Sequence, residues 1–261
     1  METRPIPYIG ITDFMTAAEA RVMLRSFGEY RTGKDPRKLM VGVMMSWKTF
    51  NGVSSRFTEA FPNKFAVPSI FLDHPLAFNT LHYADYDDFS SPHDISMMLY
   101  VCRQGGRLDA VQFDMIWPHP SLLKQVKDDS NGAIKNVLQI GANALAVEAD
   151  DPVRVCERIA QYGDLVDYVL LDKSMGQGRG MDAQVLLPFV RAIATSFSAI
   201  GIAVAGGLGP TTTHLVEPIV QEFPWISIDA QGQLRLSRSA LDPIDWSMAQ
   251  AYLEKASRIF P

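Results

Sequence analysis

Short apolar runs alternate with segments of helical periodicity along the chain, and this alternation limits the fold more than any single motif does. Each run has the length of a buried strand, and the segment behind it places apolar residues at helical spacing. Repeated strand–helix units predict a parallel sheet, because each helix carries the chain back to the same sheet edge. Eight strands are expected, at residues 7–12, 39–46, 78–84, 108–115, 133–140, 167–171, 201–206 and 225–230.

Eight such units within 261 residues favour an α/β fold of the closed (β/α)8 type, the TIM barrel. Barrels of this size form as one domain, so residues 1–261 are expected to be a single domain. An open doubly wound sheet is the rival fold, but the GxGxxG motif that usually follows its first strand is absent. Residues 47–92 are the least regular part and are expected to include an insertion after strand 2, whereas residues 242–260 predict a terminal amphipathic helix.

Composition and charge exclude several classes of partner. The formal net charge is -5, and the lysines and arginines are scattered, so we expect no nucleic-acid partner. No segment is apolar for long enough to span a membrane, and the N-terminus has no signal-peptide pattern, which predicts a cytoplasmic protein. Cys102 and Cys156 belong to no CxxC or metal-ligand spacing, and we expect two buried, reduced thiols.

Glycine-bearing loops follow the last three predicted strands. Glycines leave backbone N–H groups unshielded, so such loops can wrap closely around an anion. One loop of this kind is equally well explained as a flexible turn, but barrels often build phosphate sites from the loops after their last strands. The set therefore predicts a phosphorylated small-molecule ligand, bound through Gly176 and Gly178, Gly206 and Gly207, and Asp229, Gln231 and Gly232.

The order of these motifs resembles phosphoribosylanthranilate isomerase, a barrel enzyme of the tryptophan pathway. The resemblance is carried by LLDKSMGQGRGMD at 170–182, AVAGGLGPTTT at 203–213 and SIDAQG at 227–232, with YIGITD at 8–13 and LDAVQF at 108–113. It is strongest over residues 164–232 and does not extend over residues 47–105. The resemblance implies an isomerase that acts on a phosphorylated ribose-type molecule and needs no cofactor.

The resemblance also implies roles for individual residues. Asp172 matches the family's general acid, which protonates the ribose ring oxygen, and Gln112 matches a glutamine on the fourth strand. The family's phosphate loops correspond to Gly176 and Gly178, Gly206 and Gly207, and Gly232.

Three departures put the family's reaction in doubt. Ile9 stands where the family has its catalytic cysteine, and a hydrocarbon side chain can neither accept nor donate a proton. The family's histidine after the fourth strand is replaced by Asp114 and its neighbours. Lys48 stands near the place of an arginine after the second strand, and Arg56 cannot be aligned with that arginine. The sequence leaves open a changed reaction with a new base, or a phosphate-ligand binder without catalysis.

Asp114 is the best candidate for a replacement base. It ends an apolar strand, and partial desolvation there would raise its carboxyl pKa toward a useful range beside Asp172. The alternative is that Asp114 only caps the loop that contains Trp117 and Pro118. Asp13 is a further option, although its position also fits the N-terminal cap region of the helix that begins near Thr16.

Lys173 raises a different reaction class. A lysine at the end of a barrel strand could form a Schiff base with a carbonyl substrate, as in an aldolase-like lyase. Strand alternation argues against this, because Lys173 faces away from the barrel interior if Asp172 faces into it.

Residues 47–92 also contain histidines, acids and many aromatic side chains. The histidines show no HxH or HExxH spacing, so no metal site is predicted, and His74 and His82 are expected in a solvated acidic loop. The aromatic residues would either cover a ligand as a lid or form the interface of a homodimer, and the sequence does not separate the two. These residues are Trp47, Phe50, Phe57, Phe61, Phe65, Phe71, Phe78 and Tyr83.

Overall fold

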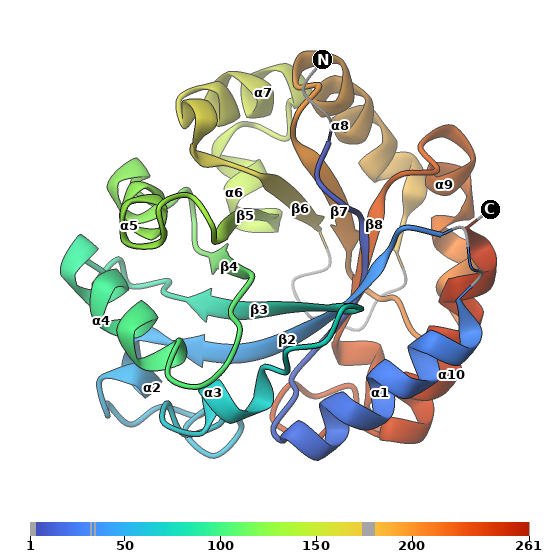
Figure 1. The fold of residues 1–261 in the computed structure, drawn as a ribbon. Coiled ribbons are helices and arrows are strands. Elements are labelled where there is room, and N and C mark those ends of the chain that lie inside the picture. Colours follow the sequence, from blue (N-terminus) through green and yellow to red (C-terminus); the bar gives the residue numbers. More distant parts are fainter. Residues whose placement is uncertain (1–3, 32, 34, 174–180, 261) are drawn as a thin grey trace.

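Eight parallel strands form a closed barrel in the order β1 to β8 in the computed structural model, which describes residues 4–31, 33, 35–173 and 181–260 (Figure 1). Each strand pairs with the next one along the chain, and β8 closes the ring by pairing with β1, where Ile9 lies opposite Ile228. The predicted (β/α)8 fold is therefore confirmed. The strands are β1 (Tyr8–Thr12), β2 (Lys38–Ser46), β3 (Ala77–Ala84), β4 (Ala110–Asp114), β5 (Lys135–Gly141), β6 (Tyr168–Asp172), β7 (Gly201–Ala205) and β8 (Ser227–Ala230).

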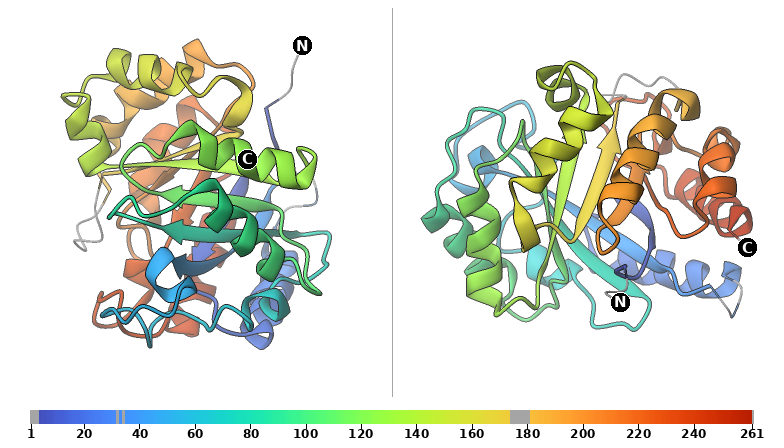
Figure 2. Two further views of the ribbon diagram at one scale, coloured as in Figure 1. Left: turned by 90° about the vertical axis from the view of Figure 1, so that its left-hand side faces the viewer. Right: turned by 90° about the horizontal axis from the view of Figure 1, so that it is seen from above.

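Helices surround the barrel on the outside, as the views in Figure 2 show. They are α1 (Ala17–Tyr30), α2 (Trp47–Phe50), α3 (Val67–Ile70), α4 (Pro92–Cys102), α5 (Pro120–Ser130), α6 (Ala142–Val147), α7 (Pro152–Ala160), α8 (Ala183–Ser196), α9 (Glu217–Glu222) and α10 (Trp246–Ile259), with 3-10 turns η1 (Gly163–Leu165), η2 (Thr213–Val216) and η3 (Gly232–Leu234). The terminal helix α10 packs beside α1 and so closes the ring of helices, as predicted.

Two features of the helices depart from a simple alternation of one strand with one helix. The helix α6 was not predicted, because it follows β5 directly with Gly141 in the cap position and no side-chain cap. Residues 212–223, whose apolar side chains recur at helical spacing, form η2 and α9 instead of one continuous helix. Pro218 lies in the first turn of α9, where its missing N–H costs nothing, whereas a continuous helix would lose a hydrogen bond there.

The irregular part of the chain is shorter than expected. The strand predicted at 78–84 is β3, and it pairs along its whole length with β2, from Ala77 opposite Leu39 to Ala84 opposite Ser46. The segment between these two strands, residues 47–76, contains the short helices α2 and α3. Both cysteines are buried and free, as expected. None of the described helices combines the length and the apolar content needed to cross a bilayer.

Aromatic side chains fill the amino-terminal end of the barrel. The ring centroids of Tyr8 and Phe78 lie 5.5 Å apart, those of Phe78 and Tyr168 also 5.5 Å, and those of Tyr8 and Tyr168 5.7 Å. Aromatic contacts at these distances are favourable. All three rings are buried in the inner core of the barrel with Met40. These rings therefore close this end of the barrel, and the interior opens toward the carboxyl ends of the strands.

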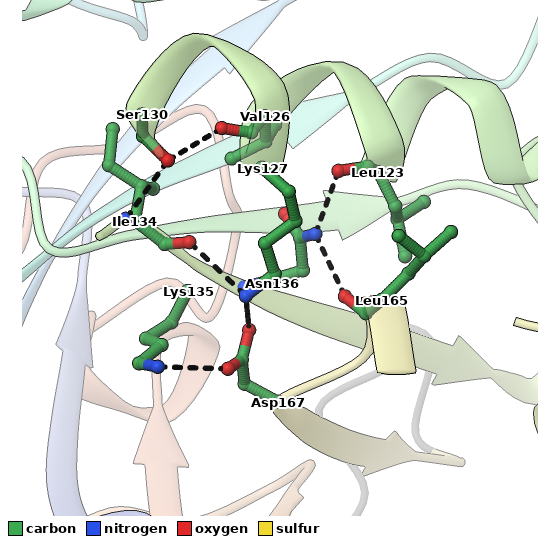
Figure 3. Close-up of polar contacts among 9 residues, drawn as sticks. All are labelled: Leu123, Val126, Lys127, Ser130, Ile134, Lys135, Asn136, Leu165 and Asp167. Carbon is green, nitrogen blue, oxygen red and sulfur yellow. Dashed lines mark hydrogen bonds and ion pairs between the residues drawn. The ribbon is translucent and has the colours of Figure 1, made fainter. Parts of the chain in front are cut away.

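A polar network ties α5 to the start of β5 and β6 (Figure 3). The buried Asn136 side chain donates to the carbonyl oxygens of Leu123 and Leu165 at 2.9 and 2.8 Å. The Asp167 carboxylate accepts from the Asn136 backbone N–H at 2.8 Å and forms ion pairs with Lys127 and Lys135. The network lies at the opposite strand ends from the open mouth, and at that end of a TIM barrel such contacts serve stability rather than chemistry.

Candidate functional site

A cavity of about 820 Å³ opens at the carboxyl ends of the strands. This is the end at which TIM barrels carry their active sites. Inward-facing polar side chains form its interior, and they come from β3 (His82), β4 (Gln112 and Asp114), β5 (Gln139), β6 (Asp172) and β8 (Asp229). The sequence-predicted residues Asp114, Asp172, Gln112, Asp229, Gly206, Gly207, Gln231 and Gly232 all line this cavity.

Strand alternation explains why these side chains converge. Leu81, Phe113 and Leu171 are fully buried against the surrounding helices, so their neighbours His82, Asp114 and Asp172 face the inside of the barrel. The same rule places Ile9 in the core under the helices. Position 9 therefore does not face the cavity, and the base of the resembled family has no counterpart on this strand.

The Asp114 carboxylate is held from two sides. Tyr86 donates its phenolic O–H to Oδ1, and the Oδ2 atom lies 3.2 Å from Nε2 of His82. Partial burial and the charge of Asp114 raise the pKa of Tyr86, so this phenol stays protonated at neutral pH. The Asp114 side chain thus points into the cavity and does not cap the loop that contains Trp117, as far as the described residues show. The indole Nε1–H of Trp117 donates instead to the Ala144 carbonyl oxygen at 2.9 Å.

His82 lies inside the barrel, and its assignment to a solvated acidic loop was wrong. Burial alone would lower the pKa of its imidazole, but the carboxylates of Asp114, Asp229 and Asp13 outweigh that effect and raise the pKa. The signal in the sequence was the polar pair Thr80 and His82, two positions apart on the predicted strand and therefore on the same face of it. His82 is the main functional candidate that the sequence reasoning missed.

Gln112 connects His82 to β5. Its side-chain nitrogen lies 3.2 Å from Nδ1 of His82 and donates to Oε1 of Gln139 at 2.7 Å. Gln112 is almost completely buried, so its main contacts are with the protein.

The Asp229 carboxyl group is more buried than that of Asp114, and its pKa is higher than that of an ordinary aspartate. Thr12 donates its hydroxyl to the Asp229 carboxylate at 3.0 Å. Burial raises the pKa of Asp229 to about 7, with a further contribution from the charge of Asp172, although His82 and Thr12 oppose the rise. Gly10 makes room for this carboxylate, since a Cβ at that position would lie 2.5 Å from Oδ1. Asp229 can therefore exchange a proton near neutral pH.

Asp172 and Lys173 face opposite ways, as alternation predicted. Asp172 ends β6, lines the cavity, and its charge raises the pKa values of Tyr86 and Asp229. Lys173 does not line the cavity, and its Nζ forms an ion pair with Asp150 at 2.6 Å.

The loops after β7 and β8 face the same cavity. Gly206 and Gly207 have φ angles of 102° and 71°, which residues with a side chain rarely adopt. Gly232 begins η3 and also lines the cavity. Gly176 and Gly178 lie outside the described residues.

A buried ion pair fixes the loop after β8. Arg235 pairs with Asp13 and donates to the carbonyl oxygens of Gln231 and Asp242 at 2.9 and 2.6 Å. The Gln231 side chain also donates to Asp13, at 2.8 Å. Asp13 therefore anchors this loop, and the cap of α1 is Thr16, whose hydroxyl accepts from the backbone N–H of Glu19.

The segment after β2 covers one side of the mouth. Of the eight aromatic residues considered for a cover over the ligand or for a dimer interface, Trp47, Phe57 and Phe61 line the cavity. Arg56 also lines it, with its guanidinium 4.7 Å from the Phe57 ring centroid, and forms no ion pair with any described residue. Lys48 is paired with Asp87 at 2.6 Å. Of the two cations of this segment that line the cavity, Lys48 and Arg56, it is Arg56 that has no ion-pair partner among the described residues and can meet an anionic ligand.

No group of three or more His, Cys, Asp or Glu side chains in the described part of the chain is arranged to hold a metal ion. What the cavity offers is proton transfer between carboxylates and an imidazole of different acidity.

Comparisons with known proteins establish the fold alone. No model of a protein family matches the chain, and no curated protein matches it. Among solved structures, the carboxyl transferase domain of Rhizobium etli pyruvate carboxylase, solved with pyruvate, aligns with a TM-score of 0.58 and 12% identity over 99% of this chain. The chain spans 48% of that protein. A putative spore coat polysaccharide biosynthesis protein E from Chromobacterium violaceum aligns with a TM-score of 0.62 and 9% identity, over 98% of this chain and 75% of the other.

Proposed function

We propose that this chain is an acid–base enzyme, an isomerase related in function to phosphoribosylanthranilate isomerase, acting on a phosphorylated ribose-type small molecule. The observation that carries the proposal is the convergence of Asp114, Asp172 and Asp229 in one cavity, the last with a pKa of about 7. A carboxyl group with a pKa near 7, beside further carboxylates that face the same ligand, suits proton-transfer catalysis.

Opening a sugar ring and moving its carbonyl group needs an acid and a base. The acid protonates the ring oxygen as the ring C–O bond breaks, and the base removes a proton from the neighbouring carbon, C2. Asp172 has the position of the acid in the resembled family and lies at the mouth, within electrostatic reach of Tyr86. Our proposal gives it that role.

Asp114 is the proposed base. Its Oδ1 atom accepts from Tyr86, and its Oδ2 atom lies beside His82. Each oxygen keeps a second lone pair that can accept a proton from the substrate. Asp229 is the alternative base, because a group with a pKa near 7 is well matched to proton transfer at neutral pH. We propose a proton-transfer role for Asp229 in place of phosphate binding, since an ionised carboxylate repels phosphate.

The ligand's phosphate would bind at the loops after β7 and β8. Gly206, Gly207 and Gly232 line the cavity with backbone that no Cβ shields, which suits an anion. Arg56, from the segment after β2, supplies a cation to the same cavity. The Schiff-base alternative receives no such support, because the Lys173 amine is paired with Asp150 outside the cavity.

Turnover of phosphoribosylanthranilate by the purified protein tests the proposal, together with aldose phosphates as further substrates. Replacing the acid or the base by asparagine, in Asp172→Asn, Asp114→Asn and Asp229→Asn, should lower turnover by about 10²- to 10⁴-fold. Asp88→Asn, at an exposed surface carboxylate, is the matched control. Full activity in all three variants would refute the proposal. Stabilisation by the sugar phosphate without turnover of any substrate would instead support a phosphate-ligand binder.

A further inference from the structure

The side chains of His82, Gln112 and Gln139 form a continuous chain from the barrel interior to the cavity surface. The Gln112 amide nitrogen has two hydrogens and two neighbouring acceptors, His82 Nδ1 at 3.2 Å and Gln139 Oε1 at 2.7 Å. With Gln112 donating to it, Nδ1 carries no proton. The imidazole proton then lies on Nε2, beside the Asp114 carboxylate at 3.2 Å.

Gln139 ends this chain at the cavity. Its oxygen is used by Gln112, while its nitrogen bonds to no described residue, is not a buried unpaired atom, and belongs to a residue that lines the cavity. In this arrangement Gln139 offers N–H donors to a ligand.

A second arrangement of the same three side chains is available. The Gln112 oxygen is buried and has no hydrogen-bond partner among the described residues. If His82 gains a second proton, Nδ1–H needs an acceptor, and rotation of the Gln112 amide supplies this oxygen. Gln139 must then rotate as well, because its nitrogen has to donate to the same oxygen. The two contacts are kept with donor and acceptor exchanged, and Gln139 turns its carbonyl oxygen toward the cavity.

We propose that Gln139 is a specificity-determining residue, which presents hydrogen-bond donors to the ligand while His82 is neutral and an acceptor once His82 is doubly protonated. The neutral state selects ligand acceptors such as phosphate, carboxylate or carbonyl oxygens, and the protonated state selects hydroxyl or amine donors. The inference deepens the proposed function, because it concerns the same cavity and rests on that cavity binding the substrate.

Charged groups from several elements face the imidazole and set its protonation. Asp114 on β4, Asp229 on β8 and Asp13 after β1 all favour the doubly protonated form, and burial opposes it. The exchange between the two arrangements is therefore set by these carboxylates and by anything that binds beside them.

Nitrogen NMR on the full-length protein without ligand tests the coupling. The protein is labelled with 15N at histidine and glutamine, and the signals of His82 and Gln139 are assigned by their loss in His82→Asn and Gln139→Met. We expect neutral His82 to carry its proton on Nε2, and the Gln139 amide signals to shift with the same midpoint pH as the imidazole. The inference would be overturned if the neutral imidazole carried its proton on Nδ1, or if the Gln139 amide signals did not shift as His82 titrates.

Variants of Gln112 test the connection itself. In Gln112→Leu the Gln139 amide should no longer follow His82, whereas Gln125→Leu, at a partly exposed glutamine bonded to Asp129, should leave the coupling intact. If Gln112→Leu does not fold, Gln112→Glu serves instead, because a carboxylate can only accept from Nδ1–H and should raise the His82 midpoint by about one pH unit or more. An unchanged midpoint in Gln112→Glu would contradict the inference. None of these measurements uses turnover, so the inference about Gln139 can be confirmed or refuted independently of the isomerase proposal.

Discussion

Asp229→Asn should gain stability relative to the wild-type protein as the pH rises, although it removes a candidate proton-transfer group. Burial raises the pKa of Asp229 from 3.8 to about 7, so the folded state holds its proton more tightly than the unfolded chain does. As pH rises through this range, the unfolded chain loses the proton first, and the folded protein is progressively destabilised. Above the folded-state pKa the protein bears the full cost of a buried carboxylate.

The magnitude follows from the two pKa values. Between about pH 4.5 and about pH 8.5 the wild-type protein should lose about 3 kcal/mol of unfolding free energy through Asp229, at about 1.4 kcal/mol for each pKa unit. The asparagine side chain of the variant cannot ionise, so the variant does not bear this loss. The difference in stability between variant and wild type should therefore change by about 3 kcal/mol in favour of the variant over that range, whatever the substitution costs at low pH.

Urea denaturation at several pH values measures this difference directly. Asp88→Asn, at an exposed carboxylate, is the control and should show no comparable pH-dependent gain. A constant difference between Asp229→Asn and wild type across the range would show that Asp229 is ionised throughout. The reasoning about its burial, and its role as alternative base, would then be wrong.

Three further substitutions test the structure. Gly10→Ala places a Cβ 2.5 Å from the Asp229 carboxylate, so it should cost about 1–3 kcal/mol in thermal or urea unfolding and reduce any turnover far more than that loss of stability explains. Asn136→Ala leaves two buried carbonyl oxygens without their donor, and should lower the unfolding free energy by about 2–4 kcal/mol in urea. Arg235→Met leaves Asp13 buried without its partner and should cost about 3–5 kcal/mol, of which the double variant with Asp13→Asn should recover part.

The barrel could be predicted from the sequence because its strands are short, apolar and regularly spaced. The strand predicted at 39–46 is β2 at Lys38–Ser46, and the one at 167–171 is β6 at Tyr168–Asp172. Such runs are buried on both faces, so local composition decides where they lie. The helix α6 escaped prediction because it has neither a side-chain cap nor a turn before it.

The site was only partly predictable. Asp114 and Asp172 line the cavity because alternation along β4 and β6 turns the last residue of each strand inward. His82 was missed although it lies in the strand predicted at 78–84, because the acidic residues that follow this strand led to its assignment to a solvated loop. The partnership of Asp13 with Arg235 joins residues 222 positions apart and follows from barrel closure, which no local pattern encodes.

The aromatic rings of Tyr8, Phe78 and Tyr168 close the barrel opposite the mouth, so the described part of the chain leaves the cavity open at one end. A ligand must leave by the route through which it came, so product has to depart before the next substrate can enter. Asp229 lines this cavity and is only 5% exposed, so a ligand that fills the cavity separates its carboxyl group further from bulk water. While a ligand is bound, a proton that Asp229 gives to the ligand is therefore expected to return from the ligand rather than from solvent.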